Sequence, residues 1–400
     1  MPAVVIADAG VAGPAGAQAL HDAGHRVRPA GGRRVLLAPI TITPSKPLTP
    51  SHLKGLLWTD VMYRATRPLA EVRYRYSHTT YHPTEQTLGF WEFLDRTQGD
   101  AAYQDLTEQE IGDHYVAFRA AGERAAARSL RPYADAVEQG WVHPASARIL
   151  ELWSEQYRAL GLHDPGLRAH QPPGLGLDEM LDGLAARGLC LDHRRIGGPV
   201  HLDLTRHGLP LRQIVTADGR PNYLACALRE LVPLAGDFDE IVLLYDPELD
   251  PDYQLLERIL ADLGPTVRRV PVGRVPIDGS IRSARHGGWG HHHAGPLLTA
   301  ALAEYDGPAV RLGMRLYFIA VLGPGQEQSF RPELLRQCLG RAQRLLATGE
   351  SGQLGTPALA GLLGRHRRDH TYVDPYRLTT SLLGKRAPAP SPELLTEVFV

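Results

Sequence analysis

ITITPSKPLTPSHLKGLLWTDVMYRA, residues 40–65, connects an apolar segment to an amphipathic one through a proline-rich turn. The apolar run RRVLLAPITI (33–42) predicts a buried strand, and Ser51 is expected to cap the helix that follows Pro50. Lys46 and His52 therefore flank a helix N-terminus, where unpaired backbone N–H groups and the helix dipole attract phosphates. The turn is a candidate site for binding a polyphosphate.

The rest of the chain alternates between strand and helix patterns. Strands are expected at 71–77, 240–245 and 266–272, and helices at 177–187, 224–233 and 252–263. Residues from about 105 to 170 and those after 295 have a helical period. This order predicts an α/β fold: a Rossmann-like parallel sheet with a helical insertion, followed by a helical C-terminal domain.

Composition and charge exclude several classes of protein. The chain has 400 residues, of which 43% are apolar and 22% charged, as in ordinary globular proteins. The longest apolar run, Leu316–Leu322, is far shorter than the ~20 residues of a membrane-spanning helix, and no signal peptide is recognised. A net charge of −1 gives no global field for DNA. The three cysteines are widely spaced, so we expect no disulfide framework, no cysteine zinc site and a cytoplasmic location.

Residues 1–30 begin like a flavin-binding Rossmann unit. In the turn DAGVAG, however, Asp8 stands where the first glycine of GxGxxG belongs, and no acidic residue ends a second strand. The segment is therefore interpreted as an N-terminal extension.

Two further segments are informative: one is a loop with phosphate-binding side chains, and the other is a block with a helical period. PIDGSIRSARHGGWG (276–290) is a glycine-rich loop after a strand, and its polar residues would reach phosphates from the side opposite Lys46 and His52. The block from Val310 to Leu346 predicts packed helices.

Taken in order, these segments resemble the catalytic core of a class I aminoacyl-tRNA synthetase, most closely the arginyl branch. PSKPLTPSHLKG (44–55) is similar to that branch's P-x-x-K-P-L-x-x-G-H-L segment, so Thr49, Pro50, Ser51 and His52 occupy the HIGH signature. IRSARHG (281–287) is similar to the KMSxRxG loop, with isoleucine where the lysine belongs. Residues 77–89 and 217–230 match two further motifs of the branch more loosely, and Val310–Leu346 resembles its stem-contact helices.

The resemblance implies that an amino-acid carboxylate attacks the α-phosphate of ATP, with Mg²⁺ accompanying ATP, and that pyrophosphate leaves. Catalytic roles are expected for His52, Lys46 and Arg285, by positioning and charge stabilisation. The resemblance assigns ATP contacts to Thr49, Ser51, Arg282, Ser283, His286 and Gly287, and amino-acid contacts to Thr41, Thr43 and Tyr223. It also suggests an extension at 1–30, a catalytic domain at 31–300 with a helical insertion at about 100–200, a stem-like domain at 301–385, and a linker and tail at 386–400.

Departures from the family pattern bear on substrate and acceptor. Ala227 aligns with the aspartate that pairs with the arginine guanidinium, and a buried guanidinium without a carboxylate is costly, so we expect another amino acid to be activated. Only about 50 residues follow the stem-like block, fewer than an anticodon-binding domain of ordinary size. We therefore favour transfer to a small amine or a carrier protein, as in tRNA-independent paralogues of specialised metabolism. A tRNA-charging enzyme of reduced size and an inactive synthetase-like binding protein remain alternatives.

Histidine-rich segments are weak candidates for a metal site. His291, His292 and His293 are consecutive in one loop, whereas metal ligands must converge from different directions. His78 and His82 have no obvious third partner. No metal site is predicted from either segment.

Overall fold

The computed structural model describes residues 32–76, 82–281, 287, 290–347, 356–384 and 390–400. The chain forms two compact units, one of which includes residues 173–237 and the other residues 30–172 and 238–400. Among the described residues, no helix combines the length and the apolar character needed to cross a bilayer. The predicted N-terminal extension lies outside the described residues.

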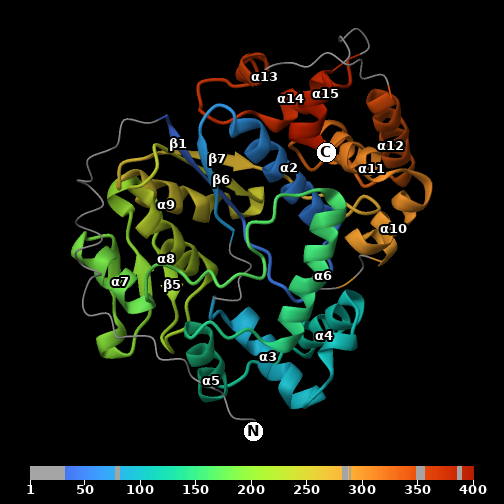
Figure 1. Ribbon diagram of the computed structural model, residues 1–400. Helices are drawn as coiled ribbons and strands as arrows, with labels where there is room; N and C mark the ends of the chain where they lie inside the picture. Colours follow the sequence, from blue (N-terminus) through green and yellow to red (C-terminus); the bar gives the residue numbers. More distant parts are fainter. Residues whose placement is uncertain (1–31, 77–81, 282–286, 288–289, 348–355, 385–389) are drawn as a thin grey trace. The chain divides into compact units, whose positions relative to one another are not determined.

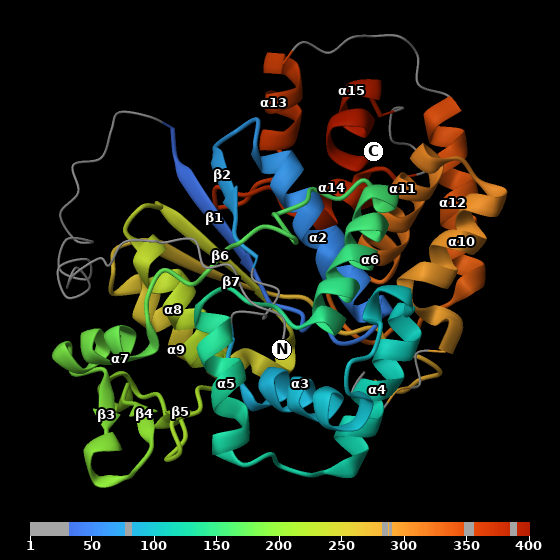
Figure 2. The ribbon, with the colours of Figure 1, turned by 60° about the horizontal axis from the view of Figure 1, so that its bottom comes forward.

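A four-stranded parallel sheet forms the centre of the larger unit, with the order β2-β1-β6-β7 (Figure 2). The strands are β1 (Arg34–Pro39), β2 (Glu71–Tyr74), β6 (Glu240–Tyr245) and β7 (Thr266–Pro271). In the two central strands, Leu37 is paired with Val242, and every residue of β6 is buried. Near-continuous apolar runs are typical of parallel strands that are covered on both faces. The predicted α/β Rossmann-like fold is confirmed.

The connections leave the two central strands in opposite directions. Helix α2 (Pro50–Thr66) leads from β1 to its neighbour β2, and helix α9 (Asp250–Ala261) leads from β6 to β7 on the other side of the sheet order. The carboxyl ends of β1 and β6 therefore flank a topological switch point, where open α/β sheets bind their ligands.

Four α-helices lie in the described residues between β2 and residue 160. They are α3 (Glu85–Gln98), α4 (Glu108–Ala121), α5 (Ala127–Glu138) and α6 (Pro144–Leu160), and they form the blue-green group of Figure 1. Thr84 and Thr107 cap α3 and α4 by accepting hydrogen bonds from backbone N–H groups three residues on. The helical period from about 105 to 170 predicted α4, α5 and α6, whereas α3 was not predicted.

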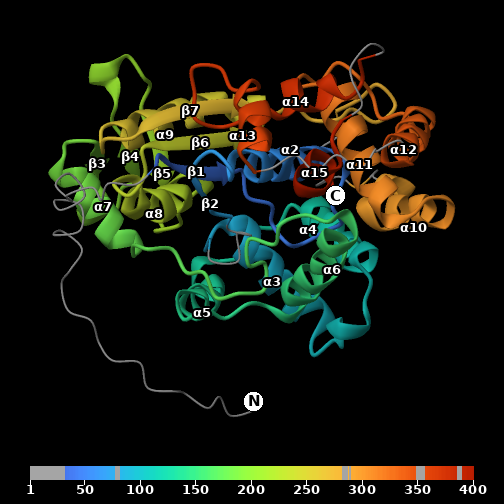
Figure 3. The same cartoon turned by 45° about the horizontal axis from the view of Figure 1, so that its top comes forward.

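The C-terminal part of the larger unit is helical, as predicted. Its elements are α10 (Ala294–Glu304), α11 (Gly307–Arg315), the π-helical turns η7 (Leu316–Val321) and η8 (Leu395–Phe399), α12 (Pro332–Ala347), α13 (Thr356–Gly364), α14 (Pro375–Ser381) and α15 (Pro392–Leu394). They form the orange and red group beside α2 (Figure 3). Helix α2 contacts α14, η7 and η8, and Val398 and Phe399 are fully buried. These contacts pack α2 against the helical C-terminal part of the unit.

In the described part of the smaller unit, residues 173–237, two α-helices accompany a three-stranded antiparallel sheet. Its elements are α7 (Leu177–Ala186), β3 (Cys190–Asp192), β4 (Val200–Leu202), β5 (Arg212–Val215) and α8 (Tyr223–Ala235), with the sheet order β3-β4-β5. Asn222 caps α8, its side-chain oxygen accepting from Ala225 N at 3.0 Å. Buried Arg229 donates from Nε to the carbonyl of Leu175 at 2.9 Å and fixes α8 to the segment before α7.

Candidate active site

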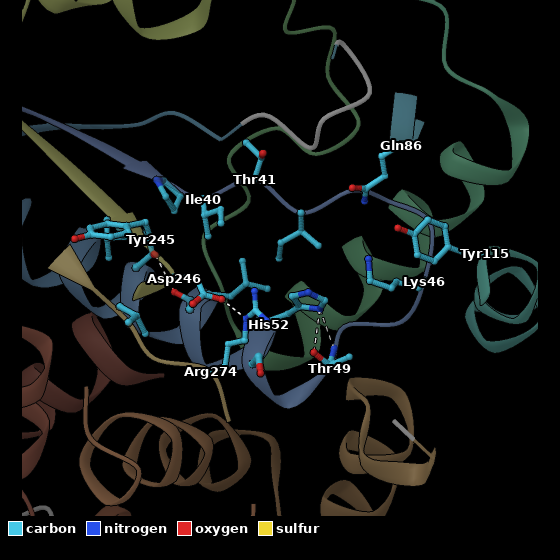
Figure 4. A pocket seen from close by; sticks show the side chains of 18 of the residues that line it. Ile40, Thr41, Lys46, Thr49, His52, Gln86, Tyr115, Tyr245, Asp246 and Arg274 are labelled. Carbon is cyan, nitrogen blue, oxygen red and sulfur yellow. Dashed lines mark hydrogen bonds and ion pairs between the residues drawn. The ribbon is translucent and has the colours of Figure 1, made fainter. Parts of the chain in front are cut away.

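A cavity of about 270 Å³ lies in the larger unit where β1 and β6 end (Figure 4). Residues from the ends of both strands, from the first half of α2, from the segment after β7 and from α3 and α4 contribute to its walls. Its polar and charged lining residues are Thr41, Lys46, Thr49, Ser51, His52, Thr59, Gln86, Tyr115, Arg119, Tyr245, Asp246 and Arg274. Five of the residues predicted from the sequence, Thr41, Lys46, Thr49, Ser51 and His52, are thus brought together.

The N-terminus of α2 is capped by Thr49, and not by Ser51 as predicted. The helix begins at Pro50, and the backbone N–H of Thr49 donates to His52 Nδ1 at 3.1 Å. Ser51 is already inside the first turn, and its hydroxyl accepts a hydrogen bond from Val275 N at 3.0 Å. The hydroxyl of Ser51 therefore fixes the segment after β7 to α2, and the first turn of α2 contributes Ser51 and His52 to the cavity lining.

His52 is held as a neutral imidazole. Burial, together with the positive charges of Lys46 and Arg274, lowers its pKa to about 3, although the carbonyl of Pro47 acts in the opposite direction. Since Nδ1 accepts from Thr49, the proton of the neutral ring resides on Nε2. The neutral ring has one N–H donor, which a ligand would share with or take from the carbonyl of Pro47, and Lys46 supplies the cation.

Side chains from the helices between β2 and residue 160 form another wall of the cavity. The Lys46 ammonium lies 4.9 Å from the centre of the Tyr115 ring, a cation–π distance that holds a nearly buried lysine against α4. Gln86, at the start of α3, donates to Thr43 Oγ1 at 3.3 Å. Thr43 itself is not among the cavity-lining residues, so it is linked to the cavity through Gln86.

Arg274 and Asp246 were missed in the sequence. Asp246 follows the last residue of β6, and its Oδ2 accepts a hydrogen bond from Arg274 Nε. Arg274 also lies 3.0 Å from Glu248 through Nη2. A polar residue directly after a buried parallel strand is a usable signal for such a site, and the YDPE sequence (245–248) contains it.

The remaining predicted residues lie elsewhere in the chain. Arg282, Ser283, Arg285 and His286 fall outside the described residues, so their contacts with ATP stay predictions. Gly287 is described, with a φ of 70°, a conformation that favours glycine, and an added Cβ would lie 3.5 Å from Val116 of α4. Tyr223 is the first residue of α8 in the smaller unit, and its contact with the amino acid also stays a prediction.

The histidines of the run at 291–293 have separate surroundings. His293 Nδ1 lies 2.9 Å from Oε1 of Glu108 in α4, and the ring of His292 is 5.4 Å from that of Phe330. His78 lies outside the described residues, whereas His82 is buried. Within the described ranges, no group of three His, Cys, Asp or Glu side chains is placed to hold a metal ion.

The parallel sheet with its cavity at the switch point has the Rossmann-like fold found in the catalytic cores of class I aminoacyl-tRNA synthetases. This confirms the fold implied by the resemblance in the sequence. The chain is similar in structure to arginyl-tRNA synthetase from Thermus thermophilus, with a TM-score of 0.59 and 15% identity over 96% of this chain and 81% of that one. At this identity, the likeness concerns the fold.

Two further solved structures match with lower scores. Arginyl-tRNA synthetase from Plasmodium falciparum matches with a TM-score of 0.47 and 10% identity, over 83% of this chain and 62% of that one. Methionyl-tRNA synthetase from Mycobacterium tuberculosis in complex with methionyl-adenylate matches with a TM-score of 0.39 and 13% identity, over 88% and 81%. Neither protein-family models nor curated protein sequences give a match.

Proposed function

We propose that this protein activates an amino acid with ATP to form an aminoacyl-adenylate. The observation that carries this proposal is the convergence of Lys46, Thr49 and His52 at the N-terminus of α2, inside a cavity at the switch point of a parallel sheet. A helix N-terminus, a cation and a neutral histidine donor together suit the phosphates of a nucleotide. The synthetase-like fold supports the same chemistry.

The reaction joins the amino-acid carboxylate to the α-phosphorus of ATP and releases pyrophosphate. In our proposal, the Lys46 ammonium and the Nε2–H of His52 stabilise the charge on the phosphates, while the α2 backbone orients them. Thr41, at the end of β1, faces the amino acid, and Thr43 is held nearby through Gln86. Asp246 is the only carboxylate among the described lining residues, so Mg²⁺ would enter with ATP and be held mainly by phosphate oxygens.

The acceptor is proposed to be a small amine or a carrier protein. Two features support this: the net charge is −1, and the loop signature has isoleucine at its first position. An extended RNA backbone demands a large positive surface. We also propose an amino acid other than arginine, because Ala227 stands where the guanidinium's carboxylate is expected.

Amino-acid-dependent exchange of radiolabelled pyrophosphate into ATP tests the proposal. We expect exchange with at least one amino acid other than arginine, and a loss of about 10²–10³-fold in the His52→Ala variant, the usual effect of removing one charge-stabilising donor. His366→Ala is the matched control, because His366 is also a partly buried histidine with a lowered pKa but does not line the cavity.

Absence of exchange with every amino acid would favour the alternative of a synthetase-like binding protein. Equal exchange by wild type and His52→Ala would remove His52 from the site. If arginine supported the fastest exchange, the inference from Ala227 would be wrong.

A further inference from the structure

Arg274 is held rigidly at the edge of the cavity. The backbone on either side of it is fixed, since Gly273 N donates to the Pro324 carbonyl at 2.8 Å and Val275 N donates to Ser51 Oγ at 3.0 Å. A Cβ at position 273 would lie 2.6 Å from the backbone of Gly325, so only glycine permits this close approach. The segment at Pro324 and Gly325 is also attached to α2, because Lys54 Nζ donates a hydrogen bond to the Gly325 carbonyl.

The guanidinium of Arg274 has donors left for a ligand. Its Nε is engaged by Asp246 and its Nη2 by Glu248. Among the described residues, Nη1 makes neither a hydrogen bond nor an ion pair. An arginine has five N–H donors in a planar fork, which matches phosphate oxygens well.

The position of Arg274 complements that of Lys46. Figure 4 shows His52 between the two cations, and the charges of both act on the imidazole. A nucleotide whose phosphates lie at the α2 N-terminus would therefore meet a positive charge on two sides. This extends the proposed function and rests on it.

We propose that Arg274 binds the phosphate groups that leave as pyrophosphate, through the donors that Asp246 and Glu248 do not occupy. Asp246 orients the guanidinium before the nucleotide arrives, so that the cation is in place and little conformational freedom is lost on binding. Because the phosphates carry several negative charges, the charge-assisted hydrogen bonds from Arg274 strengthen their binding.

The alternative is that Arg274 only fixes the turn after β6. The chain offers a matched comparison, because Arg269 of β7 also bridges two carboxylates, those of Asp250 and Glu257, but does not line the cavity. A purely structural role predicts similar behaviour for the two arginines, whereas phosphate binding predicts a difference.

Titration calorimetry on the full chain separates these roles, with inorganic pyrophosphate and adenosine as probes. In Arg274→Ala we expect the affinity for pyrophosphate to fall about 10–100-fold, as for the loss of a hydrogen bond to a charged group. Adenosine binding should stay within about twofold, as should the binding of both probes to Arg269→Ala. Arg274→Gln tests the same loss of charge in a bulkier side chain, should the alanine variant not fold.

If both Arg274 variants bound pyrophosphate as tightly as the wild type, the inference about Arg274 would be wrong. The proposed function would not be affected, because it depends on pyrophosphate exchange by the wild type. If the wild type bound neither pyrophosphate nor ATP, the inference and the proposed function would fail together.

Discussion

At the scale of single residues, the lowered pKa of His52 makes the stability of the protein depend on pH. A lowered pKa of about 3 means that the folded protein keeps this ring neutral at physiological pH. The unfolded chain, with an ordinary histidine pKa of 6.5, binds a proton below that pH. Stability contributed by the neutral ring is therefore complete above pH 6.5 and is lost progressively as the pH falls toward 3.

We predict that His52→Asn makes the protein less sensitive to acid. Between pH 7.5 and 5.0, the wild type should lose more free energy of unfolding than the variant, by at most about 2 kcal/mol and by less in proportion to the ring's partial exposure. Urea titrations at the two pH values measure this, and the other buried histidines, common to both proteins, cancel in the comparison. The same loss in both proteins would contradict a depressed pKa of His52.

A residue of the cavity could be predicted from the sequence when it lies close in sequence to the other predicted residues of the site. Lys46 and His52 were found because they surround one helix start, where proline and polar residues mark the turn, whereas Thr49 was assigned by the resemblance. Tyr115 and Arg274 were missed because each lies inside an ordinary-looking segment and reaches the cavity only through tertiary packing. Ser51 was assigned the cap of α2 since it follows Pro50, but the helix starts one residue earlier and Thr49 takes that role.

At the scale of elements, a buried ion pair fastens three helices together. Arg315, at the end of α11, is fully buried and pairs with Asp60 of α2 at 2.5 Å. It also donates to the carbonyl of Leu160, the last residue of α6, at 2.9 Å. Burial lowers the pKa of Arg315, while Asp60 opposes that shift. This contact, together with the packing of α2 on α14, η7 and η8, fixes the orientation of α2.

We predict that Arg315→Met reduces the free energy of unfolding by about 3–5 kcal/mol, because it leaves the Asp60 carboxylate buried with only part of its compensation. The control is Arg336→Met, since Arg336 is exposed on α12 and lies 4.0 Å from Glu304, a surface pair worth about 0–1 kcal/mol. Urea-induced unfolding monitored by circular dichroism provides the measurement. Equal losses in the two variants would show that the buried pair does not stabilise the arrangement of α2, α6 and α11.

Strands and long helices were predictable because their hydrophobic periods are strong. The span of β6 was predicted as observed, and those of α2 and α9 to within about two residues. The order β2-β1-β6-β7 could not be read from periodicity, because strand neighbours depend on contacts between distant segments. The sequence analysis therefore predicted a parallel sheet but no order of its strands.

At the scale of the whole molecule, charge bears on the acceptor. With a net charge of −1 and arginines such as Arg194, Arg269 and Arg274 engaged in ion pairs, the chain offers little unbalanced positive charge for an RNA backbone.

We predict that the amino acid identified by exchange is not transferred to tRNA. Total tRNA, ATP and the radiolabelled amino acid should yield no RNase-sensitive, acid-precipitable label, whereas a tRNA-charging synthetase run in parallel should give a clear signal. Such label with this protein would move tRNA charging to the first place among the candidate functions.

The pairing of β1 with β6 has a consequence for biosynthesis. Pro39 leaves the ribosome about 200 residues before Glu240, which at roughly 5–20 residues per second is a delay of about 10–40 s. During that interval, the nascent chain contains Val35, Leu36 and Leu37 without the central neighbour that covers one edge of their strand in the folded protein. Until β6 emerges, β1 can pair only with β2. Only then do both strand ends that line the cavity exist in the same polypeptide, so the cavity assembles late in translation.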